Sequence, residues 1–294
     1  MSMRPLRESD LPLALRLLRE DEEQLLGRPS RLEASDLREW LSQSDLPTDT
    51  WVIEDEGGLA AFGWSTPWGD FFAGIGIVAA RAKGRGYGAQ LVDRSEAHAR
   101  ERGAPRIQQI VLGADPAAAE LMLARDYREV RRFYEMAIEL DGPPEVPADV
   151  EIETLRDEDA RDFHDALEEA FQDHWGHHSR GFDAWWERHR SSPGFDPSLW
   201  FLVRENGSIV AAIRNEANRN GGGYVGALGV RRAFRGRGLA RALLLRTFAE
   251  FHRRGIPRVT LGVDAESPTG ATRLYESAGM EVEMENVVYE KELV

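Results

Sequence analysis

The alternation of apolar and polar positions is clearest in the second half of the chain, where it predicts strands, helices and one hairpin. The predicted strands are 150–155, 200–204, 208–213, 224–230 and 258–263. The predicted helices are 158–171, one around Trp185 and Trp186, 238–254 and 268–278, and two further strands finish the chain. Asn206-Gly207 predicts a tight turn between the second and third strands. This order, β-α-α-β-β-β-α-β-α-β-β, predicts an α/β fold of the α+β type, a mixed sheet covered by helices.

An internal repeat divides the chain into two similar halves. Residues 78–88 align with residues 230–240 at a shift of 152, and the same shift carries 102–106 onto 254–258. The intervening segment, 141–149, is rich in proline and acidic residues, as expected for a linker. We therefore expect two tandem domains, 1–140 and 150–294, joined by a linker at 141–149.

The amino-acid composition indicates which classes of binding partner suit this protein. The chain has 37 Lys and Arg against 51 Asp and Glu, a formal charge of −14, and it has no cysteine. An acidic protein is poorly suited to nucleic acid or an anionic membrane, but its field attracts amines. The longest mostly apolar stretch, 71–80, is too short to span a bilayer. We expect a cytoplasmic protein that binds neither nucleic acid nor membrane.

The segment Arg235-Gly236-Arg237-Gly238-Leu239-Ala240 lies between a predicted strand and a predicted long helix. A helix N-terminus presents unpaired backbone N–H groups to an anion, and glycine lets that backbone approach a bulky phosphate. Five arginines gather here, at 231, 232, 235, 237 and 241. A plain surface turn is the alternative, but recurrence in both halves favours a phosphate site. The sequence lacks the Lys-Ser/Thr of nucleotide hydrolases and the Gly-x-Gly-x-x-Gly of dinucleotide-binding folds.

Arg235-x-x-Gly238-x-Ala240, after a strand ending at Val230, resembles the acetyl-CoA motif of the GNAT acetyltransferase superfamily. The later segment 274–280, Leu-Tyr-Glu-Ser-Ala-Gly-Met, is similar to that superfamily's second signature. The resemblance covers 150–294 and, more weakly, 1–140. The tandem layout resembles the mycothiol synthase family. The resemblance implies two GNAT-like acyl-CoA N-acyltransferase domains and acetyl-CoA as acyl donor, without a metal.

The resemblance also assigns residues. It implies that Tyr275 protonates the departing CoA thiolate, and that backbone groups of 228–230 hold the pantetheine arm and the thioester carbonyl. Ser267 stands where the family often has an asparagine facing pantetheine. The implied acetyl-CoA-binding residues are Leu228, Gly229, Val230, Arg235, Gly236, Arg237, Gly238, Leu239, Ala240, Arg241 and Ser267.

The expected acceptor is a primary amine of a small molecule, which attacks the thioester directly in a ternary complex. An alkyl ammonium must first lose a proton, so a general base is required, and Glu216 and Asp264 are the candidates. His174 and Trp175 are candidate acceptor contacts, with a core or interface role as the alternative. The spacing of His174, His177 and His178 suits no common metal site.

The first half departs from the motif. Lys83 replaces the arginine, and Met122 stands where the second half has Tyr275, so we expect this half to be catalytically silent. Two other functions stay open: mycothiol synthase-like acetylation of a cysteinyl pseudo-sugar, and a non-catalytic acyl-CoA-binding sensor. The sequence is compatible with a monomer or a homodimer.

Overall fold

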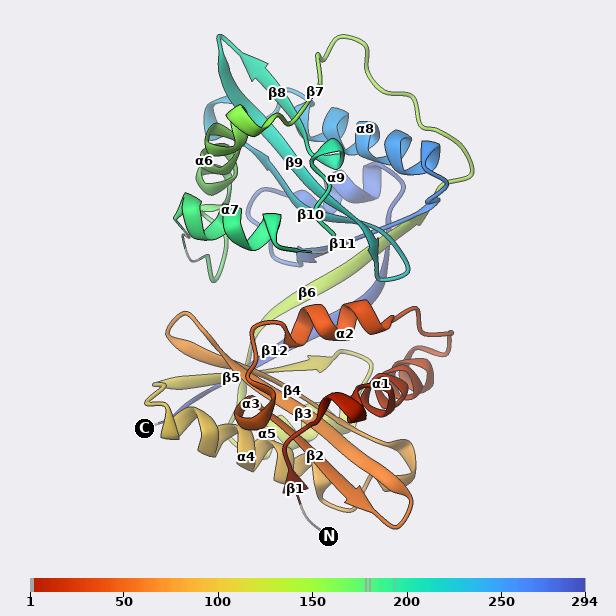
Figure 1. Cartoon of the computed structure of the whole chain (residues 1–294), viewed down its shortest axis with the longest axis vertical. Coiled ribbons are helices and arrows are strands. Elements are labelled where there is room, and N and C mark those ends of the chain that lie inside the picture. The colour runs from red at the N-terminus through yellow and green to blue at the C-terminus, as the bar shows by residue number, and fades with distance from the viewer. Residues whose placement is uncertain (1–2, 178, 180, 193, 294) are drawn as a thin grey trace. The chain divides into compact units, whose positions relative to one another are not determined.

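The computed structural model describes residues 3–177, 179, 181–192 and 194–293 (Figure 1). The chain divides into two compact units. Unit 1 consists of Met1–Phe133 and Met284–Val294, and unit 2 consists of Tyr134–Glu283. Each unit is a mixed sheet packed with helices.

Unit 2 contains the better-preserved motif. Its strand order is β6 (Arg128–Glu139), β11 (Arg258–Asp264), β10 (Gly222–Val230), β9 (Ser208–Arg219), β8 (Phe201–Glu205) and β7 (Glu153–Thr154). Strands β10 and β11 are parallel, whereas β7 to β10 pair antiparallel. Its helices are α6 (Ala160–Phe171), α7 (Phe182–Arg190), α8 (Leu239–Arg253) and α9 (Ala271–Ser277), with 3-10 turns at Asp157–Asp159, Pro197–Leu199 and Arg232–Phe234. Helix α6 packs against β9 and β10, and α8 packs against β8 to β11.

Unit 1 repeats this plan. Its strand order is β1 (Met3–Arg4), β2 (Thr50–Asp55), β3 (Gly58–Trp68), β4 (Phe71–Val78), β5 (Arg106–Leu112) and β12 (Glu281–Glu292). Its helices are α1 (Leu11–Leu26), α2 (Ala34–Leu41), α3 (Leu46–Asp49), α4 (Tyr87–Glu101) and α5 (Pro116–Leu123), with 3-10 turns at Glu8–Asp10 and Ala80–Ala82. Strands β4 and β5 are parallel, like β10 and β11.

The last strand of each half continues into the other unit, β6 from Tyr134 onward into unit 2 and β12 from Met284 onward into unit 1. Strand β12 pairs antiparallel with β5, from Asn286 opposite Leu112 to Glu292 opposite Arg106. Strand β6 lies next to β11 in unit 2, where Arg258 donates to Glu139 at 3.2 Å. The compact units therefore do not follow the sequence repeat, which places each of these strands with its own half.

Most predicted elements are present with shifted ends, and one prediction is wrong. A single strand, Glu281–Glu292, replaces the two strands expected at the end of the chain. The strand expected at 150–155 is reduced to Glu153–Thr154, and β9 extends beyond 213 to Arg219. The hairpin is confirmed, because Asn206 and Gly207 both have left-handed backbone, with φ of 50° and 82°.

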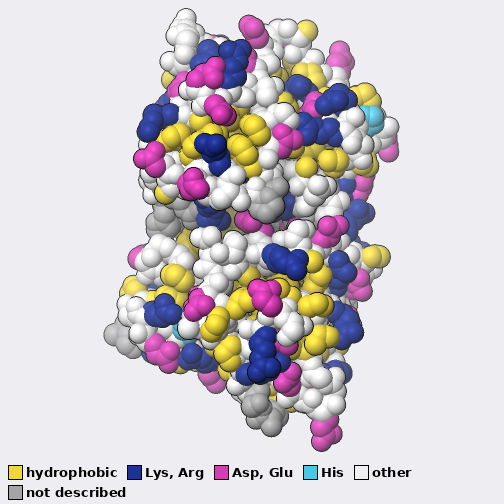
Figure 2. All heavy atoms as spheres, in the orientation of Figure 1, with side chains coloured by type: hydrophobic (Ala, Val, Ile, Leu, Met, Phe, Trp, Pro, Cys, Tyr) yellow, Lys and Arg dark blue, Asp and Glu magenta, His cyan; other side chains and the backbone are white. Residues whose placement is uncertain are grey.

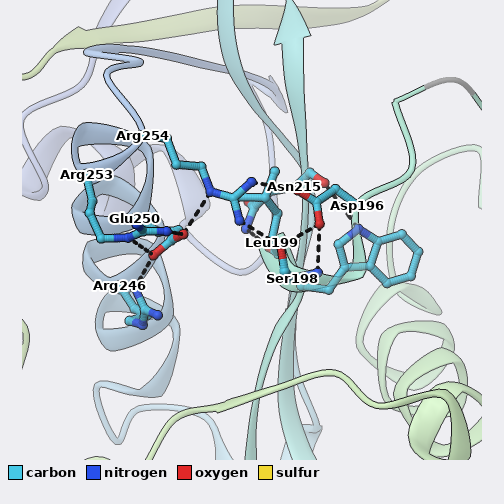
Figure 3. Close-up of polar contacts among 9 residues, drawn as sticks. Asp196, Ser198, Leu199, Asn215, Arg246, Glu250, Arg253 and Arg254 are labelled. Carbon is cyan, nitrogen blue, oxygen red and sulfur yellow. Dashed lines mark hydrogen bonds and ion pairs between the residues drawn. The ribbon is translucent and has the colours of Figure 1, made fainter.

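The core of unit 2 lies between α6, α8 and the sheet. Leu244, Phe248 and Phe251 of α8 are all buried, as the helical pattern predicts. At the end of that helix, Glu250 is buried and accepts from Arg246, Arg253 and Arg254 (Figure 3). The three guanidinium groups hold the pKa of Glu250 at about 2.

The surface is strongly charged. On the face visible in Figure 2, acidic and basic side chains are interspersed among smaller apolar patches. Within the described part of the chain, no helix is long and apolar enough to cross a membrane.

Candidate active site

The turn between β10 and α8 has the backbone that the glycine pattern predicts. Gly236 and Gly238 have φ of 76° and 79°, and Gly238 is the residue that caps α8. Only glycine adopts this region routinely, so these glycines fix the turn. A Cβ at either position would meet nothing within 4 Å, so the turn is open on its outer side. The first N–H groups of α8 lack partners within the helix and are available to an anion at this point.

Strands β10 and β11 separate next to this turn. Their parallel register covers Gly223–Val225 opposite Val259–Leu261, and the cavity opens beyond it. On its other edge β10 stays paired with β9, as far as Val230 opposite Ala211. Bulges after Gly222 and Val225 bend β10 where the separation begins. The backbone edge of β10 beyond Val225 therefore faces a cavity instead of a strand.

This cavity has a volume of about 340 Å³ and brings together nearly all the residues expected at the site. The expected residues that line it are Leu228, Gly229, Val230, Arg235, Gly236, Arg237, Gly238, Leu239, Ala240, Arg241, Ser267, Tyr275 and His174. Trp175 is not among the lining residues and is about one-third exposed.

Arg235 and Arg237 are held by the protein itself. Arg235 donates to the backbone carbonyl oxygens of Val230 at 3.2 Å and Ala170 at 3.1 Å, which ties the turn to α6. Arg237 makes a two-pronged ion pair with Glu205, at 2.6 and 3.1 Å. Both guanidinium groups still contribute positive charge to the cavity lining, but the N–H groups of the turn are the hydrogen-bond donors left for an anion.

Tyr275 is the most buried of the lining residues that carry a hydroxyl group. It projects from α9 and is 8% exposed. Burial and the neighbouring Tyr224 raise the pKa of Tyr275 to about 12. Its phenol therefore keeps its proton throughout the physiological pH range.

His174 and Ser267 lie elsewhere on the wall. Burial lowers the pKa of His174, whose ring lies 4.5 Å from the ring of Phe171, so this imidazole is neutral at pH 7. The Ser267 hydroxyl lies 2.9 Å from the hydroxyl of Thr269.

The two carboxylates considered as general base differ in position. Asp264 is 8% exposed and lines the cavity. Glu216 is not among the lining residues and pairs with Arg214 and Arg219. Burial acts to raise the pKa of Glu216, but the two arginines lower it overall. Asp264 is the better placed of the two.

One wall was not predicted from the sequence. Ala170 and Phe171 of α6 line the cavity, and a Cβ on Gly229 would lie 2.7 Å from that of Ala170. The sequence feature that could have indicated this wall is Gly229, because a glycine inside a predicted strand often marks the close approach of another element. Among the described residues no group of three or more His, Asp or Glu side chains could hold a metal ion, and His178 lies outside them.

Comparisons with known proteins agree with this geometry. The acetyltransferase (GNAT) family profile matches residues 14–127 and 156–280. The chain belongs to the GNAT acetyltransferase family. Both halves match, so it is a tandem GNAT protein and an acyltransferase.

Curated relatives share one name. The mycothiol acetyltransferase of Thermobispora bispora is 32% identical over 82% of this chain and 82% of its own length. That of Thermobifida fusca is 29% identical over 72% of each chain.

Solved structures show the same fold. A GCN5-related N-acetyltransferase from Sphaerobacter thermophilus is 33% identical with a TM-score of 0.89, covering 99% of this chain and 95% of that one. A tandem GNAT protein from the clavulanic acid biosynthesis pathway has a TM-score of 0.75 at 17% identity, covering 100% of this chain and 98% of that one.

Proposed function

We propose that this GNAT protein transfers an acetyl group from acetyl-CoA to the primary amine of a small molecule, and that the half spanning 150–294 carries the reaction. The observation that carries the proposal is a single cavity with the glycine turn of α8 at one side and buried Tyr275 in its wall.

The lining of this cavity suits acetyl-CoA. Three arginines (Arg235, Arg237 and Arg241) and Asp264 give it a net charge of +2, with His174 neutral. The N–H groups of 236–241 are the proposed donors to the diphosphate. The exposed edge of β10 at 228–230 is the proposed partner of the pantetheine amides and the thioester carbonyl, with Ser267 beside them. Because Gly229 lets α6 approach closely, Ala170 and Phe171 close the side of this channel.

The proposed chemistry needs two proton transfers. The neutral amine nitrogen attacks the thioester carbonyl carbon, a C–N bond forms, and the C–S bond breaks with its electron pair going to sulfur. Tyr275 gives its proton to that sulfur, and we assign removal of the ammonium proton to Asp264, acting through water. No covalent acetyl-enzyme is formed, so donor and acceptor are bound together.

His174 is the proposed acceptor contact, because it lines the cavity with a neutral ring. Trp175 lies outside the lining, so its proposed contact is with parts of the acceptor that extend beyond the cavity. Replacing His174 with alanine is expected to raise the KM of the acceptor and leave the Kd of acetyl-CoA unchanged.

The relatives favour one particular acceptor. Their shared name supports acetylation of a cysteinyl pseudo-sugar, as in mycothiol synthase, as a second candidate. Strand β10, however, has no acidic residue, where mycothiol synthase is expected to carry a glutamate. A panel that sets this acceptor against other small amines distinguishes the two candidates.

A matched pair of variants tests the donor site. Gly236 and Gly84 occupy equivalent turns with φ of 76° and 78°, and neither has an atom within 4 Å of an added Cβ. Gly236→Asp places a carboxylate where we propose the diphosphate binds, and is expected to abolish acetyl-CoA binding and amine-dependent CoA release. Gly84→Asp carries the same backbone strain and is expected to leave both unchanged. Binding of acetyl-CoA without turnover on any amine would favour the sensor function instead.

A further inference from the structure

Unit 1 contains a second cavity at the position equivalent to the proposed donor site. Its volume is about 330 Å³, and its lining includes Lys83, Gly84, Gly86 and Met122. Strands β4 and β5 separate beside it as β10 and β11 do, since their parallel register covers only Phe72–Gly74 opposite Ile107–Gln109. The shape of an acyl-CoA site is therefore kept.

The backbone of the turn is also kept. Gly84 and Gly86 have φ of 78° and 80°, close to those of Gly236 and Gly238. The N–H of Gln90 donates to Gly86 O at 3.1 Å, as Ala242 does to Gly238 O at 3.0 Å. The first N–H groups of α4 are thus arranged like those of α8, and any difference in anion binding comes from side chains.

The charge of the lining is reversed between the two cavities. Three arginines and one aspartate line the cavity of unit 2. One lysine and two aspartates, Lys83, Asp21 and Asp115, line that of unit 1 and give a net charge of −1.

Lys83 is held between the two carboxylates. Its ammonium nitrogen lies 2.9 Å from Asp21 Oδ1 and 3.7 Å from Asp115 Oδ2. All three side chains are largely buried, with exposed fractions of 31%, 15% and 18%. We call this arrangement the carboxylate bridge. The neighbouring cations are paired as well, since Arg81 and Arg85 lie 2.6 and 3.3 Å from Asp55.

Both carboxylates of the bridge are absent from unit 2. Asp21 lies eleven residues after Asp10, which precedes α1, and the residue eleven after Asp159, which precedes α6, is Ala170. Asp115-Pro116 aligns with Ser267-Pro268 at the shift of the repeat. An alanine and a serine in the proposed donor site are therefore replaced by two aspartates in unit 1.

We infer that the carboxylate bridge takes the place of a ligand phosphate in unit 1, so that unit 1 excludes CoA and the chain binds one CoA. An anion entering this turn meets two carboxylates within a few ångströms of the only lysine of the lining, in a partly desolvated cavity where such repulsion is strong. The stoichiometry of one rests on the proposed function of unit 2, whereas the exclusion by unit 1 does not.

Isothermal titration of the full chain with CoA tests the inference, using variants that copy unit 2 into unit 1. The wild type is expected to bind one CoA, and Gly236→Asp none. Asp21→Ala with Asp115→Ser, added to Gly236→Asp, is expected to restore one site, with a gain in affinity of at least about 100-fold. Asp70→Ala in the same background removes an exposed carboxylate that pairs with Arg106 outside the cavity, and is the matched control, expected to restore nothing. Circular dichroism checks that each variant is folded.

Each outcome decides the inference. Two CoA molecules per wild-type chain, or one that survives Gly236→Asp and is lost with Gly84→Asp, overturn it. A wild type that binds no CoA refutes the proposed function of unit 2 alone, and the inference then stands or falls on whether Asp21→Ala/Asp115→Ser creates a site. If the double variant folds and gains no affinity, the bridge is not what excludes CoA.

Discussion

Replacing Tyr275 with phenylalanine removes one oxygen atom from the wall of the cavity and leaves the ring in place. The tyrosine is 8% exposed, and its pKa of about 12 keeps it protonated wherever the enzyme works. A thiol ordinarily titrates near 8.5, so the phenol is not needed to keep free CoA protonated; in the proposed reaction it supplies a proton at the moment the C–S bond breaks. Loss of a positioned general acid lowers kcat by about 10²- to 10⁴-fold, or about 3 to 5 kcal/mol of barrier.

The measurement is the pH dependence of kcat with a saturating amine. Deprotonation of the acceptor produces a limb that rises with pH, and a phenol with a pKa of about 12 adds no falling limb below about pH 11. Tyr275→Phe is therefore expected to lower the plateau without moving the rising limb, and to leave the Kd of acetyl-CoA unchanged. Tyr224→Phe is the control, because Tyr224 is a neighbouring tyrosine outside the cavity lining.

Two results would refute this reasoning. A kcat within about threefold of the wild type would show that Tyr275 only packs against CoA or Leu274. A rising limb that disappears in Tyr275→Phe would show that the phenol acts in its ionised form.

Three further predictions concern stability. Gly223→Ala would place its Cβ 2.7 Å from the ring of Phe251, so we expect a loss of about 1–3 kcal/mol in urea unfolding, relieved by a compensating Phe251→Leu. Burial lowers the pKa of His189 to about 4, so the stability that neutral His189 gives the folded protein is present above pH 6.5 and is lost as the pH falls from 6.5 toward 4. His189→Gln should therefore flatten the fall in the free energy of unfolding over that range. The pKa of Glu250 is about 2, so its ion pairs contribute about 2–3 kcal/mol to the free energy of unfolding above pH 4.5, and this contribution is lost as the pH falls toward 2. If the stability of Glu250→Gln and of the wild type fell equally in acid, this prediction would be contradicted.

Local structure was predictable where one short-range pattern controls it. Asn206-Gly207 gave the hairpin, and the Gly236/Gly238 turn gave the start of α8 within one residue. The cavity in unit 2 lies beside the same turn, because a strand, a glycine turn and a helix in sequence fix their own geometry.

The errors arise where partners far away in the chain decide the structure. Strand β9 continues past 213 because Asn215, fully buried, donates to the Leu199 carbonyl oxygen at 2.6 Å and to Thr247 at 3.0 Å. A polar residue whose side-chain NH2 group is paired in this way looks like a strand end in the sequence. Strand β12 is continuous because Glu283 pairs with Arg258 and Glu285 with Arg132, so its acidic residues do not break it.

The wall from α6 and the carboxylate bridge were invisible for a related reason. A periodic pattern shows that α1 and α6 are helices with an apolar face, but not which residue of each helix reaches the turn. Asp21 and Ala170 acquire their roles only when the helices are packed on their sheets.

The placement of β6 and β12 has a consequence for how the protein is made. While the ribosome is still producing the second half, the nascent first half lacks the strand that covers β5, and this edge of its sheet is open. It stays open until residues 284–292 leave the exit tunnel, whereas unit 2 is contiguous from Tyr134 to Glu283 and all its residues are synthesised earlier. Separate expression of residues 1–140 and 150–294 would leave unit 1 without β12 and unit 2 without β6.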